Sequence, residues 1–202
     1  MKYSAGKLLL ATNNKGKIRE YLHLLQGTSL KLVTPAEQGI DIEVEETGAS
    51  LEENARLKAI AFAAESGLLT VADDSGLEVD ALGGEPGVFS ARYAGEGASD
   101  SDRVNYLLSR MKDVPQEKRT TRFRCVIALA FPEGEIYLCH GECHGMIIFE
   151  AKGKQGFGYD PIFLLPELNK TMAELPPEIK NSISHRAMAA GQARQMLINL
   201  GF

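Results

Sequence analysis

Two adjacent carboxylates, Asp73 and Asp74, follow an apolar run and precede a glycine-rich segment. Residues 68–72 are β-prone and bounded by Gly67, so they predict a buried strand that delivers both carboxylates to its carboxyl end. That edge is where open α/β sheets bind ligands. Because successive residues of an extended chain point to opposite sides, we expect one aspartate to face a ligand and the other to anchor the loop. Taken alone, Asp-Asp-Ser-Gly is slightly better explained as a polar turn.

A second polar segment follows a predicted strand at residues 7–11 and precedes a helix that Gly27 ends. Its hydroxyl, amide and ammonium groups lie at the helix N-terminus, where free N–H groups favour a phosphate. The segment comprises Thr12, Asn13, Asn14, Lys15, Gly16 and Lys17. It matches neither common glycine-rich phosphate-binding pattern, so the residues alone leave a solvated turn open.

A capping box formed by Ser50 and Glu53 predicts a helix that ends near Ser66. Asn54 and Lys58 lie on the apolar stripe of this helix or at its border. A lysine there needs an anionic partner or must extend its side chain to solvent. Helical spacing alone leaves both outcomes open for Lys58.

Two later segments contain groups that suit a planar polar ligand. Three glycines and the Asp160-Pro161 pair within residues 153–165 predict a rigid loop that can present Phe157 flat to a ring. Anchoring of the loop onto the core explains the aromatic residues equally well. Cations from Lys180 to Arg186 cluster at the predicted start of the last helix, where they oppose the macrodipole unless an anion or a polar ligand is present. A surface helix tolerates such a cluster at small cost.

The remaining pattern predicts an α/β fold with a mixed sheet, because strands and helices alternate and a hairpin meander follows. The further predicted strands are residues 31–33, 123–131 and 136–140, with residues 146–149 as a third segment of the meander, and the further helices begin near Ser99 and Ser184. No Pro/Ser-rich linker or charge block divides the chain, so we expect one domain over residues 1–202, with room for two lobes.

Composition narrows the classes of function. The net charge is −5, with 22 Lys plus Arg against 27 Asp plus Glu, which disfavours a broad grip on nucleic acid. No apolar run has signal-peptide or membrane-spanning length, so we expect a soluble cytoplasmic protein without a membrane partner. The run from Cys139 to His144 contains soft-metal ligand types but lacks two separated pairs, which favours a strand over a zinc site.

The segment ADDSGLEVDALGGEPGVFSARYAG, residues 72–95, resembles the central signature of the inosine triphosphate pyrophosphatase family, enzymes that clear non-canonical purine nucleotides. Further similar motifs are Glu46-Thr47-Gly48, Asn54-Ala55, Lys58-Ala59, Phe157 to Pro161, and Lys180 to Arg186. The chain departs from the family at none of the positions that these motifs specify.

This resemblance implies an elongated two-lobed fold around a mixed, largely central sheet, with a nucleotide-binding cleft between the lobes, and a homodimer. It implies a magnesium site at Glu46 and Asp74, which suits a hard cation that prefers carboxylates, phosphate oxygens and water. We expect Asp74 to be the general base as well. The implied substrate-binding residues are Thr12, Asn13, Asn14, Lys15, Gly16, Lys17, Lys58, Ser75, Phe157, Gly158, Tyr159, Asp160, Lys180, His185 and Arg186.

The activity that the resemblance implies is Mg²⁺-dependent hydrolysis of ITP, dITP and XTP to the monophosphate and pyrophosphate. Lys17, Lys58 and Lys180 carry charges that can neutralise a triphosphate, and His185 or Arg186 can donate to the 6-oxo group that distinguishes these bases from adenine. Two alternatives are a related pyrophosphatase for modified pyrimidine triphosphates and a non-catalytic nucleotide sensor. Paired acids around a metal favour an enzyme over a sensor.

Overall fold

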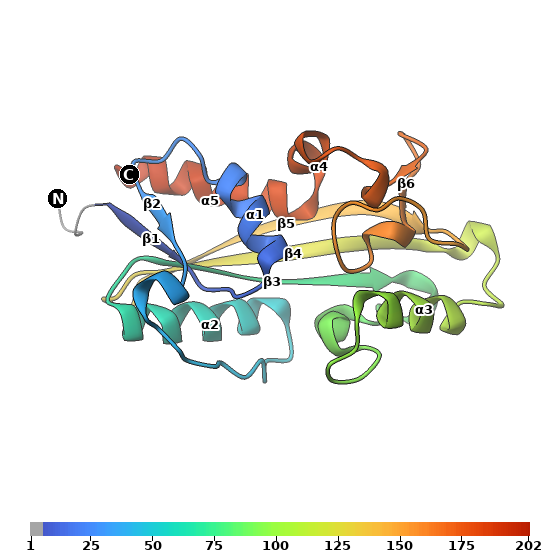
Figure 1. The fold of residues 1–202 in the computed structure, drawn as a ribbon, viewed down its shortest axis with the longest axis horizontal. Helices are drawn as coiled ribbons and strands as arrows, with labels where there is room; N and C mark the ends of the chain where they lie inside the picture. The colour runs from blue at the N-terminus through green and yellow to red at the C-terminus, as the bar shows by residue number, and fades with distance from the viewer. Residues whose placement is uncertain (1–5) are drawn as a thin grey trace. The chain divides into compact units, whose positions relative to one another are not determined.

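The computed structural model describes residues 6–202, which form a seven-stranded sheet in the order β2-β1-β3-β4-β5-β6-β7 (Figure 1). The strands are β1 (Lys7–Leu10), β2 (Lys31–Val33), β3 (Thr70–Val79), β4 (Thr120–Ala130), β5 (Ile136–Ile147), β6 (Phe163–Leu165) and β7 (Lys170–Thr171). The helices are α1 (Lys15–Leu24), α2 (Leu51–Ser66), α3 (Asp100–Arg110), α4 (Pro177–Ile183) and α5 (His185–Asn199). Because β1 pairs in parallel with β2 and β3, and β6 pairs antiparallel with β5 and β7, the expected mixed α/β sheet is confirmed.

The described residues group into two compact units. Unit 1 contains the described residues through Asp74, together with Cys125–Gly141 and Arg186–Phe202, and unit 2 contains Ser75–Arg124 and Glu142–His185. Each unit has its own buried hydrophobic cluster. The strands β3, β4 and β5 contribute residues to both units. The expectation of a single domain over residues 1–202 stays a prediction.

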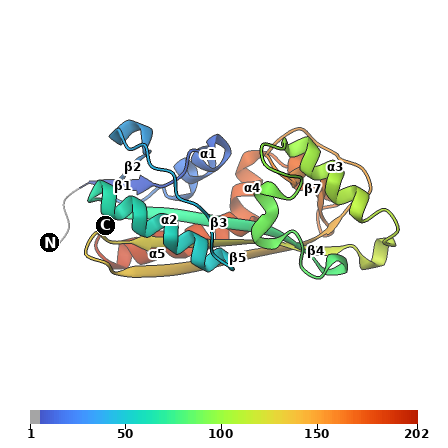
Figure 2. The ribbon, with the colours of Figure 1, turned by 90° about the horizontal axis from the view of Figure 1, so that it is seen from below.

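In unit 1, helices cover both faces of the strands. Helices α1 and α5 lie on one face and α2 on the other (Figure 1), and Figure 2 views the face that α2 covers. The buried hydrophobic cluster between the strands and helices α1 and α5 includes Leu8, Leu10, Tyr21, Val71, Ile127, Ala189 and Ala193. Two helix ends follow their predicted signals, because Ser50 Oγ accepts the Glu53 N–H at 3.2 Å and Gly67 ends α2 with a φ of +64°.

Strand β3 is longer than the sequence suggested, and this changes where the aspartates lie. The strand was expected to end before Asp73, but it continues to Val79, so both carboxylates lie within it. Their burial is possible because partners from other elements satisfy them. Gly76 allows the continuation to pack, since a Cβ at that position would lie 2.3 Å from the carbonyl oxygen of Gly87.

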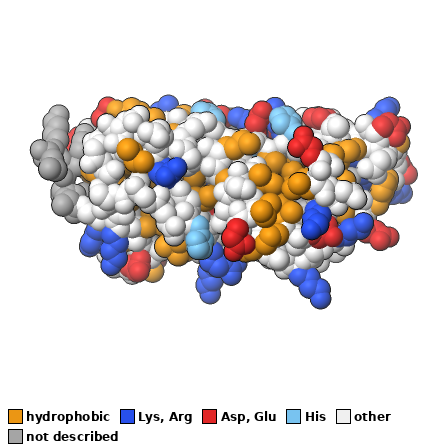
Figure 3. All heavy atoms as spheres, turned by 90° about the horizontal axis from the view of Figure 1, so that it is seen from above, with side chains coloured by type: hydrophobic (Ala, Val, Ile, Leu, Met, Phe, Trp, Pro, Cys, Tyr) orange, Lys and Arg blue, Asp and Glu red, His pale blue; other side chains and the backbone are white. Residues whose placement is uncertain are grey.

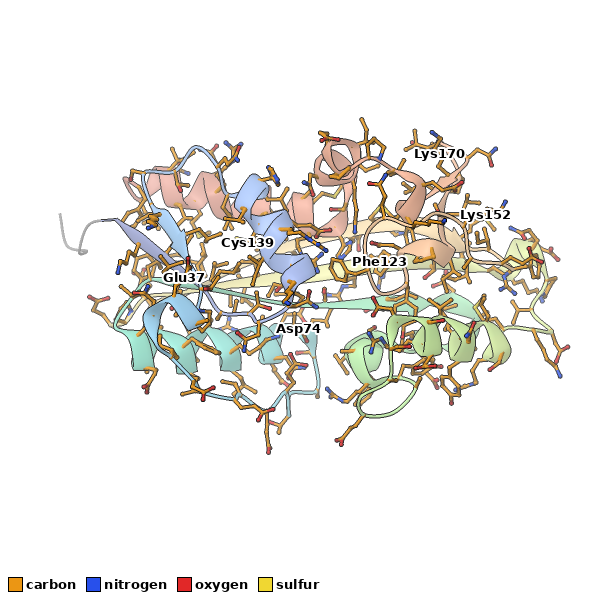
Figure 4. All side chains as sticks on the ribbon, in the orientation of Figure 1. Glu37, Asp74, Phe123, Cys139, Lys152 and Lys170 are labelled. Atoms are coloured by element: carbon orange, nitrogen blue, oxygen red, sulfur yellow. The ribbon has the colours of Figure 1, made fainter. Side chains whose placement is uncertain are left out.

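The predicted bounds of the meander need correction, whereas those of the last helix agree with the structure. Residues 136–147 form one strand, β5, in place of two separate segments. Cys139, labelled in Figure 4, and Cys143 are buried free thiols within this strand. The last helix was expected from about Ser184, and α5 begins at His185, which confirms this boundary. A separate short helix, α4, precedes it, because Ser184 is extended, with a φ of −73° and a ψ of 159°. Lys180 therefore lies on α4, and only His185 and Arg186 begin α5.

The surface of the described residues agrees with a mildly acidic protein. On the face shown in Figure 3, which includes α1 and α5, basic and acidic side chains are interspersed and form no single basic stripe. Among residues 6–202, no helix is both long and apolar enough to span a membrane.

Candidate active site

The polar turn before α1 is built around Asn14, which caps this helix. Its Oδ1 accepts N–H groups from Gly16 at 2.8 Å and Lys17 at 3.1 Å, and its own N–H donates to Thr12 Oγ1 at 3.2 Å. Asn13, Asn14 and Lys15 are exposed, whereas Gly16 is buried. The turn therefore has a fixed backbone and presents amide and ammonium groups to solvent, as an anion-binding loop requires.

Asp73 is buried in a network of charges on the side of α1 and α5. Its Oδ1 lies 3.0 Å from Lys17 Nζ and its Oδ2 lies 3.3 Å from Arg186 Nε. Arg186 also pairs through NH1 with Glu20 Oε2 at 2.6 Å. Burial alone would raise the pKa of Asp73, but Lys17 and Arg186 outweigh it and hold this pKa well below its ordinary value. Asp73 is therefore a charged anchor for Lys17.

Asp74 points to the other face, towards α2. Its Oδ2 accepts from Asn54 Nδ2 at 3.1 Å, and its Oδ1 lies 3.5 Å from Lys58 Nζ. Burial raises the pKa of Asp74, and the carboxylate of Glu46 adds to this effect. The expected division of the two aspartates between opposite faces is confirmed, because alternate residues of β3 meet different helices.

Lys58 is the centre of the group around Asp74. Its Nζ lies 2.6 Å from Glu46 Oε1 and donates to the carbonyl oxygen of Asp73 at 2.7 Å. Burial opposes the charge, but Asp74, Asp73 and Glu46 outweigh burial, so the pKa of Lys58 lies above its ordinary value. Of the two outcomes left open for this lysine, the structure supports the anionic partner and not extension to solvent.

Asn54 connects the acidic loop with Asp74. Its Oδ1 accepts the Gly48 N–H at 2.8 Å, so its Nδ2 is the group that faces Asp74. Gly48 lies so close that a Cβ there would be 2.6 Å from Asn54 Oδ1. The sequence placed Asn54 beside the apolar stripe of α2 but did not reveal this role, because both partners lie outside the helix.

The carboxylates of unit 1 fit a magnesium ion by their chemistry. Among residues 6–202, no group of three or more His, Cys, Asp or Glu side chains could hold a metal ion by itself. Magnesium needs only one or two carboxylates when substrate phosphates and water complete its shell. Glu46 and Asp74 both contact the Lys58 ammonium, which shows that the two side chains converge on one positive charge.

In unit 2, the loop around Phe157 is held at successive residues. The Phe157 N–H donates to Asp160 Oδ2 at 2.9 Å, and the Tyr159 hydroxyl donates to the carbonyl oxygen of Ser90 at 2.9 Å. The Lys180 ammonium pairs with Asp160 Oδ2 and lies 4.9 Å from the centroid of the Phe157 ring. Lys180, expected to neutralise a triphosphate, is thus buried and has its charge matched by Asp160 within unit 2.

The predicted cluster from Lys180 to Arg186 is divided between the units. His185 is buried in unit 2 and stacks on Phe123, with ring centroids 4.6 Å apart and planes inclined by 17° (Figure 4 labels Phe123). Arg186 belongs to unit 1, where its partners are Asp73 and Glu20. The structure therefore gives these neighbours different surroundings, and base reading by either of them stays a prediction.

The predicted site residues form two groups, each within one unit. Unit 1 contains Thr12, Asn13, Asn14, Lys15, Gly16, Lys17, Glu46, Lys58, Asp74 and Arg186. Unit 2 contains Ser75, Phe157, Gly158, Tyr159, Asp160, Lys180 and His185. Sequence reasoning missed Glu20 as well as the role of Asn54. Glu20 lies on α1 three residues after Lys17, so helical spacing placed it on the same side, but its partner Arg186 is distant in sequence.

The chain is an α/β protein in which the first of these groups gathers lysines and carboxylates, the side-chain types that suit phosphate groups and a divalent cation. Residues 8–196 match the Ham1 family. The chain is 52% identical to the dITP/XTP pyrophosphatase of Desulforamulus reducens, over 96% of each chain. It is 45% identical to the dITP/XTP pyrophosphatase of Bacillus subtilis, over 94% of this chain and 96% of that one.

Solved structures agree with these relatives. The HAM1 protein of Coxiella burnetii superimposes with a TM-score of 0.88 at 41% identity, over 96% of this chain and 100% of that one. The Ham1 protein of Staphylococcus aureus gives 0.86 at 41% identity, over 96% and 99%. The chain belongs to the Ham1 family. The resemblance to inosine triphosphate pyrophosphatases found in the sequence is thereby confirmed.

Proposed function

We propose that the protein hydrolyses the non-canonical purine nucleoside triphosphates dITP, ITP and XTP to the nucleoside monophosphate and pyrophosphate. The names of the relatives support this substrate class. The observation that carries the chemistry is the convergence of Glu46, Asp74 and Lys58 in unit 1, next to the lysine-containing turn before α1. A binding module has no need of two acids paired around a metal together with this ammonium group.

In this proposal Asp74 is the general base. It takes a proton from water as the water oxygen bonds to the α-phosphorus, and the bridging P–O bond breaks so that pyrophosphate leaves with the bonding electron pair. Burial raises the pKa of Asp74, which makes this carboxylate a stronger base than an exposed one. Asn54 holds one of its oxygens, which orients the carboxylate.

Lys17 and Lys58 bind phosphate oxygens in this proposal, and Asp73 orients Lys17. The turn from Thr12 to Gly16 contributes further donors. Glu46 and Asp74 would hold magnesium, which supplies positive charge to phosphate oxygens when it is bound.

The loop of unit 2 reads the base in this proposal. Phe157 stacks on the purine, and donors from His185 or Arg186 meet its 6-oxo group. Adenine presents an amino donor at that place, so two donors would be left unpaired. Each buried unpaired group costs about 1–3 kcal/mol, so the two donors together cost about 2–6 kcal/mol, which corresponds to roughly 30-fold or more in kcat/KM.

Product analysis tests the reaction. The protein is incubated with the triphosphates of inosine, xanthosine, adenosine and thymidine, and pyrophosphate, orthophosphate and nucleotide products are measured. We expect pyrophosphate and the monophosphate from the inosine and xanthosine nucleotides. Early orthophosphate with a nucleoside diphosphate would contradict attack at the α-phosphorus. Preferred turnover of the thymidine nucleotide would favour the pyrimidine alternative, and binding without turnover would favour a sensor.

We further propose, from the family resemblance, that the protein uses Mg²⁺ and forms a homodimer. We also propose that it acts in the cytoplasm on free nucleotides and does not bind nucleic acid. Light scattering coupled to size-exclusion chromatography measures the mass in solution, and a monomer at micromolar concentration would contradict the dimer. Replacement of Mg²⁺ by Ca²⁺, which tolerates less regular coordination, tests the ion.

A further inference from the structure

One of the hydrogen bonds that anchor the Phe157 loop joins its backbone to a residue of α3. The Gly158 N–H donates to Asp100 Oδ2 at 2.7 Å, across 58 residues of chain. Asp100 is the first residue of α3, and both residues belong to unit 2. Gly158 has a φ of +61°, in the left-handed region, so this peptide adopts a conformation that other residues rarely take. An ionised acceptor on this N–H makes a strong hydrogen bond.

Asp100 is itself held in place by a neighbour on the helix. Its Oδ1 pairs with the Arg103 guanidinium, which also donates to the carbonyl oxygens of Ala91 at 3.0 Å and Ala98 at 2.5 Å. Ala91 lies in the short helical segment Gly87–Arg92, whose Ser90 carbonyl accepts the Tyr159 hydroxyl. The loop is therefore connected to α3 and to this segment by adjacent residues.

The contact between Asp100 and Gly158 is not needed to form α3. Ser99 caps the helix by accepting the Asp102 N–H at 3.2 Å, while Asp102 Oδ2 accepts the Ser99 N–H at 2.9 Å. Val104 and Leu107 bury the helix against the core of unit 2. Asp100 is thus available for a task outside its own helix.

We propose that Asp100 is a positioning residue for base selection, because it fixes the peptide between Phe157 and Gly158 and with it the plane of the Phe157 ring. This inference rests on the proposed function, in which Phe157 stacks on the purine. Asp160 accepts the Phe157 N–H from within the loop, and the Lys180 ammonium of α4 lies against the Phe157 ring. Without Asp100 the loop keeps these contacts but loses the one that orients the Gly158 amide.

The test compares Asp100→Ala with Asp100→Asn, which keeps an uncharged acceptor of the same shape, and with Asp102→Ala as the matched control. Asp102 lies in the same helical turn and caps α3 without contacting the loop. Measured quantities are kcat and KM for ITP and ATP, the melting temperature, and hydrogen exchange of the Gly158 amide. The loss of one hydrogen bond corresponds to about a five- to tenfold effect.

For Asp100→Ala we expect KM for ITP to rise about five- to tenfold with kcat within about twofold of wild type, a smaller preference for ITP over ATP, and faster exchange at Gly158. Asp100→Asn should recover much of the selectivity. Asp102→Ala should lower the melting temperature without changing the preference.

Two results would overturn the inference alone: an unchanged preference in Asp100→Ala although exchange at Gly158 is faster, or an equal change of preference in Asp102→Ala. Wild-type protein that neither binds nor hydrolyses ITP would instead overturn the proposed function, and the inference with it.

Discussion

The neighbouring aspartates of β3 are expected to respond in opposite ways to the same substitution. Asp73→Asn keeps the shape of the side chain but removes the charge between Lys17 and Arg186. Asp73 is only 2% exposed, so solvent cannot replace the lost partner. Removing one member of a buried ion pair costs about 3–5 kcal/mol. At about 2–4 °C per kcal/mol for a chain of this length, the melting temperature should fall by about 6–20 °C.

Asp74→Asn should leave the melting temperature within about 2 °C of that of the wild type, or raise it. A change of 2 °C corresponds to only about 1 kcal/mol or less in the free energy of unfolding. Burial raises the pKa of Asp74, which means that the fold disfavours its charged form. An asparagine can turn its oxygen towards Asn54 and keep that hydrogen bond. The charge removed from this position therefore costs the fold little.

The two carboxylates also predict opposite pH dependences. The pKa of Asp73 lies below its ordinary value, so its stabilising effect is complete above the unfolded pKa of about 4 and is lost as the pH falls through the folded pKa. The gap in melting temperature between wild type and Asp73→Asn should thus persist from about pH 8 to about pH 5 and narrow in stronger acid. The raised pKa of Asp74 gives the opposite dependence of stability on pH, because the folded protein then binds the proton of this carboxyl group more tightly than the unfolded chain does.

Thermal unfolding monitored by circular dichroism, with a chelator present to remove metal ions, measures these differences. Equal melting temperatures for the two variants at neutral pH would contradict the role of Asp73 as a buried charged anchor, as would a larger loss in Asp74→Asn. Either result would mean that the charges around Asp73 are better solvated than their burial indicates.

Four other outcomes follow from the site. Asp74→Asn should bind nucleotide but lose at least about 100-fold in kcat, as measured by pyrophosphate release, and comparable turnover would remove Asp74 from the mechanism. Phe157→Ala should lower kcat/KM for all purine triphosphates, and His185→Ala or Arg186→Ala should narrow the gap between the kcat/KM values for ITP and ATP; an unchanged ratio in both C-terminal variants would place base reading elsewhere. Chelation of divalent ions should abolish turnover and added Mg²⁺ should restore it, with persistent activity as the contrary result. Burial raises the pKa of the Cys125 thiol to about 12, so this residue should resist alkylation at pH 8 until the protein is unfolded. Mass spectrometry detects the alkylated residue, and rapid alkylation of Cys125 in the native protein would contradict this prediction.

Local signals in the sequence predicted the elements whose ends are set by neighbouring residues. Ser50 caps α2 and Gly67 ends it as expected, because a cap depends on contacts within one helical turn. Strand β2 has its predicted bounds at Lys31–Val33. Most of the candidate site residues were predicted from the family motifs instead. These motifs combine residues that are distant in the sequence and that no capping or turn signal relates to one another.

Sequence reasoning failed where distant parts of the chain decide the outcome. Polar residues were expected to end β3 at Asp73, but Arg186 neutralises that residue from 113 positions away. Likewise, nothing near Gly158 indicates that its amide meets Asp100. Burial of a polar group is predictable only when its partner is known, and these partners are set by tertiary packing.

Asp73 and Asp74 point to opposite faces of the sheet because one stands at an odd and the other at an even position along β3. The alignment of this strand with β1 is fixed by the pairs Leu9 with Thr70 and Leu10 with Val71. A slip of one residue would turn the Asp73 side chain towards α2 and the Asp74 side chain towards α1 and α5, whereas a slip of two would keep each on its present face. A single residue inserted after Val71 would therefore place Asp73 on the side of α2 and Asp74 on the side of α1 and α5, although every original side chain is kept.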